Sequence, residues 1–356
     1  MSAAALRRAR LADGIIADSS RGVLVTGLAQ VRYLTGFTGS HATLCGSSTG
    51  WLLITDSRYA IQVARECPDL SVMIERASFH AGCQWLSERG VRDLFVEESL
   101  AAIDFVAAGR IFTSVTPDLS FLTQLRSVKD SVEIALVAQA GSITATVLTD
   151  WAHDISVGMT ERQIARELES RFISAGASGV AFESIVAAGE NSAIPHHRPT
   201  DRPLCVGDLL VIDCGAKVDG YRADMTRTYI VAAQPQDWQL QAHEAVTAAQ
   251  QQGCDSLRPG ISAVEIDEAV RRVIDESGFG KEFSHGTGHG VGLDIHEWPL
   301  LVPRGTGTIR AGMTLTVEPG VYLEGKGGVR IEDTVLVTEG APHILTETDR
   351  ALVRIG

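Results

Sequence analysis

Four acidic residues at matching places in two apolar stretches could do chemistry together. Asp213 ends the apolar run 209–213, and Asp224 falls on the predicted returning strand, 221–231. Glu318 and Glu332 occupy the corresponding places about 105 residues further on. Unpaired carboxylates are costly to bury, and neighbouring carboxylates repel one another unless a cation lies between them. If the two predicted hairpins pack face to face, the four carboxylates converge on a shared cation site. The alternative is salt bridges to the nearby arginines Arg222, Arg227 and Arg330.

Histidines lie between these acids. The segment 284–297, SHGTGHGVGLDIHE, contains His285, His289 and His296, and the pair His196 and His197 lies upstream of Asp213. His285 and His289 have the spacing of a helical zinc pair, but the interleaved glycines favour a strand or loop that passes close to a ligand. Four oxygen ligands and one or two imidazoles suit Mn²⁺ or Co²⁺, with Zn²⁺ possible. Such a cage can hold two ions about 4 Å apart, with a bridging hydroxide as nucleophile.

The elements that must position these residues are repeated. Residues 158–164, GMTERQI, resemble 260–266, GISAVEI, and both contain a capping box that opens an amphipathic helix. The two helices are expected to end at Gly176 and Gly278. Residues 207–215 likewise match 312–320. We therefore expect two copies of a helix-then-strand unit after residue 130.

The leading part of the chain has a different pattern. Short β-like runs alternate with helical patterns up to about residue 125, which indicates a small α/β domain. A polar stretch, 126–130, then leads into a long amphipathic helix over about 131–155. We place the boundary there and expect domains at 1–126 and 127–356.

Composition excludes several classes of protein. Among 356 residues, 44 acidic residues outnumber 31 basic ones, and no run rich in Lys or Arg occurs, so nucleic acid is not an expected partner. The six cysteines contain no C-x-x-C pair, which favours a reduced, cytoplasmic protein. No signal-like stretch and no continuous apolar run of membrane-spanning length is found, so no membrane association is expected.

The order of these acids and histidines along the chain resembles that of the pita-bread metallopeptidases, in the Xaa-Pro branch that comprises aminopeptidase P and prolidase. The resemblance is carried by the five ligand positions and by residues 31–59, VRYLTGFTGSHATL…WLLITDSRY. It implies an α/β (α+β) chain with a small creatinase/prolidase-like N-terminal domain and a pseudo-two-fold duplicated pita-bread catalytic domain.

The resemblance also implies the metal ligands. Asp213 would bind one metal ion bidentately, and Asp224 and Glu332 would bridge two divalent ions, most suitably Mn²⁺. His289 and Glu318 would complete the other metal position. These five residues carry the family's ligand types in the family's order.

Catalytic roles follow from the same resemblance. Glu318 would accept the proton of the attacking water. His196, in a PHxRPT segment, would stabilise the tetrahedral intermediate, and His296 would contact the substrate. His285 and Arg330 would orient the metal ligands or the substrate without binding the metal themselves. The adjacent His197 is given no role.

The activity implied is hydrolysis of the Xaa-Pro bond at the N-terminus of peptides, as in aminopeptidase P. The alternative is a prolidase restricted to Xaa-Pro dipeptides, which must recognise the free carboxylate after proline. Partners are then proline-containing peptides or dipeptides and, by resemblance, a second copy in a homodimer. The N-terminal domain, or that of a partner subunit, is expected to close the site. Candidate elements are His41 and Arg58 for the closure and Phe182 and Trp298 for the proline pocket.

Other classes fit less well. Residues 46–50 match G-x-S-x-G, but they join two β-like runs, whereas a nucleophile elbow leads into a helix. A methionine aminopeptidase would not need the leading domain, and a creatine amidinohydrolase works without metal and lacks the full ligand set. A pita-bread binding protein without catalysis is the remote alternative, although all five ligand positions are intact.

Overall fold

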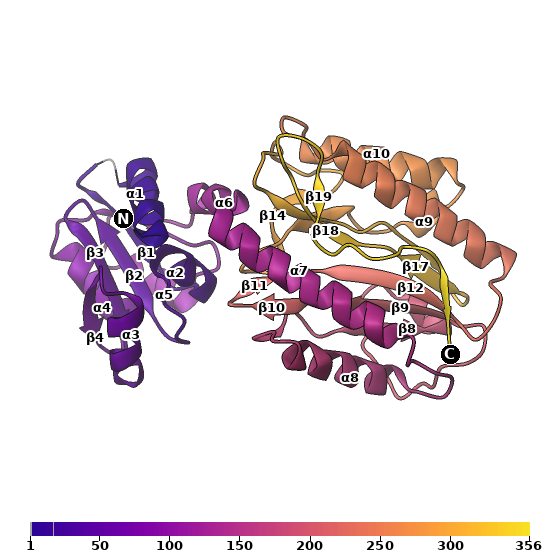
Figure 1. Ribbon diagram of the computed structural model, residues 1–356. Helices are drawn as coiled ribbons and strands as arrows, with labels where there is room; N and C mark the ends of the chain where they lie inside the picture. Colours follow the sequence, from indigo (N-terminus) through magenta and orange to yellow (C-terminus); the bar gives the residue numbers. More distant parts are fainter. Residues whose placement is uncertain (1, 17) are drawn as a thin grey trace. The chain divides into compact units, whose positions relative to one another are not determined.

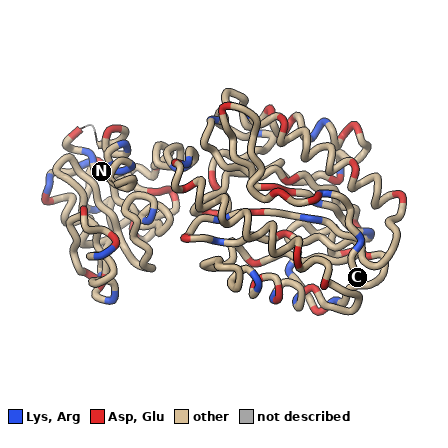
Figure 2. The backbone as a smooth tube through the Cα atoms, in the orientation of Figure 1, with Lys and Arg blue, Asp and Glu red and all other residues tan. Residues whose placement is uncertain are grey.

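The chain divides into two compact units. The computed structural model describes residues 2–16 and 18–356, and its first unit ends at Arg126 while the second spans Ser127–Gly356 (Figure 1). Basic and acidic residues are interspersed along both units, and the basic ones are scattered rather than gathered on one element (Figure 2). Each unit is described by itself below.

The first unit is built on one mixed sheet with the strand order β4-β3-β2-β1-β5-β6. Its strands are β1 (Arg21–Val25), β2 (Thr43–Ser47), β3 (Gly50–Thr55), β4 (Ser71–Ile74), β5 (Asp93–Val96) and β6 (Ser114–Thr116). Its helices are α1 (Ala3–Ile15), α2 (Leu28–Thr35), α3 (Ala60–Glu66), α4 (Ser78–Ser87) and α5 (Ala102–Ala108), and the boundary after Arg126 falls in the last turn of α6 (Ser120–Ser127). Ser47 pairs with Gly50 across the β2–β3 hairpin, so the G-x-S-x-G match is a hairpin turn, as expected.

The second unit places its strands between two pairs of helices (Figure 1). The helices are α7 (Ser131–Ala152), α8 (Glu161–Ser174), α9 (Asp237–Ser256) and α10 (Ala263–Glu276). The first sheets have the orders β20-β12-β9-β8 and β11-β10-β7. Their strands are β7 (Gly179–Val180), β8 (Ile185–Ala188), β9 (Leu209–Cys214), β10 (Ala216–Val218), β11 (Tyr221–Arg222), β12 (Met225–Val231) and β20 (Val353–Ile355).

The remaining strands form the second half of this unit, in a sheet of order β14-β13-β15-β18-β19 and a hairpin β16-β17. They are β13 (Gly288–Gly290), β14 (Glu297–Leu301), β15 (Thr314–Val317), β16 (Gly320–Leu323), β17 (Gly327–Arg330), β18 (Asp333–Leu336) and β19 (His343–Ile344). The antiparallel pair β15–β18 corresponds to β9–β12 of the first half.

The duplication expected from the sequence is confirmed in the element order and in the helix caps. Thr160 caps α8 and Ser262 caps α10, each in a complete capping box. Each helix is followed by a glycine with positive φ, Gly176 at 98° and Gly278 at 85°. Residues other than glycine rarely adopt this backbone conformation. The second unit is therefore a pseudo-two-fold duplicated domain.

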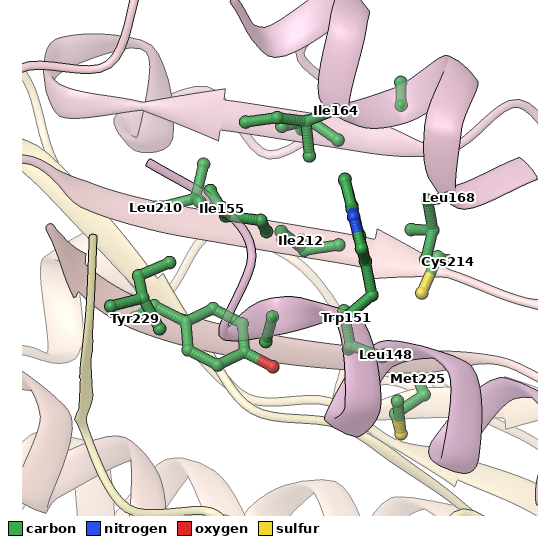
Figure 3. Close-up of a cluster of buried hydrophobic side chains, with 14 of the residues drawn as sticks. Leu148, Trp151, Ile155, Ile164, Leu168, Leu210, Ile212, Cys214, Met225 and Tyr229 are labelled. Carbon is green, nitrogen blue, oxygen red and sulfur yellow. The ribbon is translucent and has the colours of Figure 1, made fainter. Parts of the chain in front are cut away.

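Alternation along β9 turns its side chains to two different cores. Leu210 and Ile212 pack with Trp151 of α7 and Leu168 of α8 (Figure 3). Leu209 instead belongs to the cluster formed with α9 and α10. Because successive strand residues point to opposite faces, Asp213 shares the face of Leu209, which is turned toward the second half of the unit.

Helix α7 is long and apolar enough to cross a membrane by length and composition, with a mean hydropathy of 1.5 over its most apolar window. The sequence expectation, based on continuous apolar runs, did not foresee this. Within the second unit the helix packs against β10 and β11, where the amide of Ala216 donates to Thr144 Oγ1 and Tyr221 OH donates to Glu133 Oε1. A core helix meets the same length and composition test, and α7 contributes Leu148, Trp151 and Ala152 to an apolar core of this unit.

The core beside α8 yields a stability prediction. Phe172 is fully buried, whereas the next residue, Ile173, is 51% exposed. We expect Phe172→Ala to lower the free energy of unfolding by about 3 to 5 kcal/mol, because it leaves a cavity. Ile173→Ala is the matched control, and it should change stability by less than about 1 kcal/mol. Urea unfolding of both variants measures the difference, and similar losses would contradict this packing.

Candidate metal centre

The first half of the second unit supplies two acids from different backbone settings. Asp213 lies inside β9, opposite Thr226 of β12. The expected continuous strand over 221–231 is wrong at Asp224, which lies in a break between β11 and β12. The break has a physical cause: the amide of Arg222 donates to the carbonyl of Gly292, and the amide of Asp224 donates to Thr334 Oγ1. Both backbone groups thus bond to the second half instead of a neighbouring strand.

The second half supplies its acids in the same way. Glu318 directly follows β15, and Glu332 lies between β17 and β18. The amide of Glu332 donates to the carbonyl of Thr226, so a backbone bridge joins the two halves at the acids themselves. This bridge holds the two predicted hairpins face to face.

The acids converge around His289. Asp224, His289 and Glu332 each offer a ligand atom, and these atoms lie within 4.8 Å of one another. Glu318 Oε1 lies 3.3 Å from His289 Nε2. Asp213 lies outside the set of three, and its Oδ2 accepts a hydrogen bond of 2.7 Å from Arg330 Nη2.

The salt-bridge alternative accounts for only one of the acids. Arg330 pairs with Asp213, but Arg227 pairs with Asp333 and Arg222 lies 3.8 Å from Asp294. Among the residues that the structure describes, Asp213 Oδ1, Asp224 Oδ1 and Glu332 Oε1 are buried carboxylate oxygens without a hydrogen-bond partner. Buried polar atoms are rarely left unsatisfied, so these oxygens fit a cation.

His289 is held in the tautomer that a metal ion requires. Its Nδ1–H donates to the carbonyl of Gly290 at 2.9 Å, so Nε2 carries the lone pair. Nε2 faces Glu318 Oε1 and, at 3.7 Å, Asp224 Oδ2. Electron-rich atoms facing one another in this way are stabilised by a cation between them.

The pKa values of these groups show the cost of the arrangement in the absence of a cation. Burial, with the neighbouring Glu332 and Asp213, raises the pKa of Asp224 far above its ordinary value. Burial and the charges of Glu318 and Asp213 do the same to the pKa of Glu332. Burial raises the pKa of Glu318 to about 8 and lowers that of His289 to about 4. All of these groups favour the neutral form unless a cation compensates their charge.

Threonines that the sequence analysis did not single out orient the ligands. Thr226 Oγ1 donates to Glu332 Oε2 at 2.7 Å, and Thr316 Oγ1 donates to Glu318 Oε1 at 3.2 Å. Thr334 Oγ1 donates to the carbonyl of Asp224. The signal was present as threonines alternating with other residues, in 226–228 and 314–316.

A cavity of about 500 Å³ opens onto the acids. Its lining includes His196, His296 and Phe182. It also includes the four carboxylates predicted to bind metal, those of Asp213, Asp224, Glu318 and Glu332. The rings of His289 and His296 meet edge to face with their centroids 4.4 Å apart. The lining does not include Trp298, whose ring packs against Gly307 beside an apolar core, so the expectation that it forms a pocket wall is wrong.

His285 and Arg330 meet at Tyr322, a residue that the sequence analysis missed. Arg330 Nη1 donates to Tyr322 OH, which lies 2.8 Å from His285 Nε2. Arg330 Nη1 also donates to the carbonyl of Pro195, and Nε donates to Thr226 Oγ1. One guanidinium thus holds Asp213, the threonine that orients Glu332, and the residue before His196.

His197, which had no predicted role, anchors the segment that carries His196. Its Nε2–H donates to Glu161 Oε2 at 2.8 Å. Glu161 is fully buried at the start of α8, and it also accepts from Ala188 N, Asn191 Nδ2 and both the amide and hydroxyl of Thr200. Burial raises the pKa of Glu161, but these hydrogen bonds lower it by more, so that the pKa lies below its ordinary value.

The glycine-rich segment runs against the neighbouring strand. A Cβ at Gly288 would overlap the carbonyl oxygen of Thr316, so the backbone approach requires glycine. His289 thereby lies close to β15, where its amide donates to Thr316 Oγ1 at 3.0 Å.

An ion pair fixes the far end of this segment. Lys129 Nζ lies 3.0 Å from Glu297 Oε2, with the side chains only 1% and 7% exposed. Glu297 Oε1 accepts from the amide of Asp294. Lys129 belongs to the polar stretch at which the domain boundary was placed, and it is buried against the residue that follows His296.

The chain is similar to known proteins over both of its units. The model of metallopeptidase family M24 matches residues 135–339, and that of the creatinase/prolidase N-terminal domain matches residues 7–128. The chain belongs to metallopeptidase family M24. This places it within the predicted Xaa-Pro branch of the pita-bread family and confirms the predicted fold class.

Relatives of this M24 chain agree in family. An Xaa-Pro dipeptidase of Pyrococcus horikoshii is 40% identical over 232 residues, which span 65% of this chain and 66% of the relative. The solved structure of an Xaa-Pro dipeptidase from Bacillus anthracis, 31% identical, covers 99% of this chain and is itself covered fully, with a TM-score of 0.93. That of an X-Pro aminopeptidase from Thermotoga maritima, 33% identical, covers 96% of this chain and 98% of its own, with a TM-score of 0.85.

The raised pKa of Glu318 leads to a pH prediction for the metal-free protein. Its pKa is about 8 in the folded state against 4.5 for an ordinary glutamate, so the folded chain keeps a proton that the unfolded chain releases. Its contribution to stability is therefore lost as pH rises from about 5 to about 8. Glu318→Gln, which stays neutral, should gain stability over the wild type across this range. Thermal melts of both proteins in chelator measure this difference in stability. Histidines that titrate in the same range are common to both proteins, so they do not change the difference.

Mn²⁺ should reverse this order, because the ion binds the carboxylate and stabilises the folded state of the wild type. A wild type that equals Glu318→Gln at every pH, with and without Mn²⁺, would contradict a cation site at Glu318.

The Lys129–Glu297 pair leads to a third prediction. Lys129→Met should lower the free energy of unfolding by about 3 to 5 kcal/mol, because it leaves a buried carboxylate without its partner. The double variant Lys129→Met/Glu297→Leu should recover most of this loss. Denaturant unfolding of the two variants tests the ion pair, and equal stabilities would show that Glu297 finds another partner.

Proposed function

We propose that the chain is a divalent-metal-dependent Xaa-Pro dipeptidase. The observation that carries the proposal is the set of buried carboxylate oxygens without partners, which lies beside a cavity containing His196 and His296. The substrate class is supported by the relatives of the chain, since those described above are named as Xaa-Pro dipeptidases or an X-Pro aminopeptidase.

A dipeptidase is better supported than the aminopeptidase P activity that the sequence analysis favoured. The 40% identical relative and the structure with a TM-score of 0.93 are both named Xaa-Pro dipeptidase. Aminopeptidase P activity is the second candidate, and the Thermotoga maritima structure favours it.

The donor set fits a divalent ion such as Mn²⁺, because it combines carboxylate oxygens with one neutral imidazole and contains no thiolate. The ligands we assign are those of the sequence analysis, namely Asp213, Asp224, His289, Glu318 and Glu332. When bound, the ions polarise the scissile carbonyl and lower the pKa of a water molecule.

The chain's own residues perform the proton transfers and hold the substrate. Glu318 accepts the proton of the attacking water and returns it to the leaving proline nitrogen. His196 and His296 line the cavity next to the acids, where they can donate hydrogen bonds to the oxyanion or the substrate backbone. Arg330 donates hydrogen bonds to Asp213 and to the carbonyl of Pro195, and these bonds fix the position of the metal ligand Asp213 relative to the segment that carries His196.

The proposal is tested by assaying Ala-Pro and Ala-Pro-Ala with the full chain and Mn²⁺. We expect release of proline from Ala-Pro, loss of activity in chelator, recovery with Mn²⁺, and slower cleavage of the tripeptide. Faster cleavage of Ala-Pro-Ala would establish the aminopeptidase P candidate instead. If neither peptide is cleaved with Mn²⁺, Co²⁺ or Zn²⁺, the peptidase proposal is wrong.

Asp224→Asn links the activity to the site. It removes one charge from the acid cluster while keeping the side-chain shape, so we expect a loss of at least about 100-fold in kcat, as outer partners alone cost 10- to 100-fold. Asp219→Asn, at the exposed turn between β10 and β11, is the matched control and should keep full activity.

A further inference from the structure

We propose that Arg198 binds the free carboxylate of the substrate and thereby selects dipeptides over longer peptides. The inference rests on the proposed function and names the residue that would set its specificity. It follows from the charges that line the cavity and from the way in which the segment 195–200 is held.

The cavity contains one basic side chain of the lysine or arginine type among its described lining residues. That residue is Arg198, and it lies among five acids, Glu183, Asp213, Asp224, Glu318 and Glu332. Two divalent ions would offset the charge of four of these acids. Arg198 is then the group that can attract an anion into this part of the cavity.

Arg198 makes no ion pair or hydrogen bond to the residues that the structure describes. The neighbouring arginines do: Arg202 pairs with Asp208 at 2.6 Å, and Arg330 pairs with Asp213. Arg198 is exposed to the cavity and keeps all of its guanidinium donors available. An exposed, unpaired guanidinium at the edge of an acidic cavity suits a carboxylate, which it can bind through two parallel hydrogen bonds.

The backbone presents Arg198 on the same side as His196. His196, His197 and Arg198 all line the cavity, and the ring of His197 is held by its hydrogen bond with Glu161. Pro195 and Pro199 restrict the backbone at both ends, and Thr200 is tied to Glu161. One anchored segment thus carries both the residue assigned to the oxyanion and, two positions on, a cation for the group that follows proline.

This placement gives a chemical basis for discrimination. In an Xaa-Pro dipeptide, the residue after the scissile bond ends in a carboxylate, whereas in a longer peptide the same position is a neutral amide. A guanidinium gains a charge-assisted hydrogen bond only with the former. Arg198 therefore favours free dipeptides without excluding amides by shape.

The test compares Ala-Pro with Ala-Pro-amide, which differ only in that charge. We expect the wild type to prefer Ala-Pro. Arg198→Met should lower kcat/KM for Ala-Pro by about 10- to 100-fold, mainly through KM, because a charge-assisted hydrogen bond is lost. Its activity on Ala-Pro-amide should stay at the wild-type level, and Arg198→Lys should recover part of the preference. Arg166→Met, on the exposed face of α8, is the matched control for loss of one positive charge.

The outcomes separate this inference from the proposed function. If Arg198→Met loses activity equally on both substrates, or on neither, Arg198 does not read the carboxylate, and the inference is wrong while the peptidase assignment stands. A wild type that cleaves the amide as fast as the acid also overturns it. A wild type that cleaves neither substrate fails the proposed function itself.

Discussion

The structure of the second unit depends on mutual repulsion among buried carboxylates. Asp224 and Glu332 share one site with His289, and the pKa values of both are raised by burial and by neighbouring carboxylates. Such a cluster is costly without a cation, yet the surrounding fold leaves several of its oxygens without partners. Strands, threonines and the glycine segment all serve to hold this unfavourable arrangement in place until an ion balances it.

Duplication makes the arrangement possible. Each half contributes one acid within or directly after a strand and one acid in a break between strands, so neither half can form the site alone. The bridge between Thr226 and Glu332 joins the halves through the backbone, and Arg227 adds a hydrogen bond to the carbonyl of Glu332. The metal ligands are thus tied to the contact that holds the domain together.

Local signals predicted much of this, and long-range contacts explain what they missed. The capping boxes at Thr160 and Ser262 and the acids at strand ends depend on neighbouring residues, so they could be recognised directly. The break at Asp224 depends on Thr334, and the burial of Lys129 depends on Glu297, partners that no local pattern specifies. Similarly, Tyr322 has no recognisable spacing to His285 and Arg330, because only the fold brings the three together.

The carboxylate of Glu161 has a consequence for how the site meets its ligand. By collecting donors from Ala188 through Thr200, it attaches the whole His196 segment to the rigid start of α8. The loss of conformational entropy is then incurred when the chain folds, not when a ligand enters. A dipeptide offers few atoms with which to compensate a disordered wall. A preorganised cavity wall allows so small a molecule to be held by a few contacts.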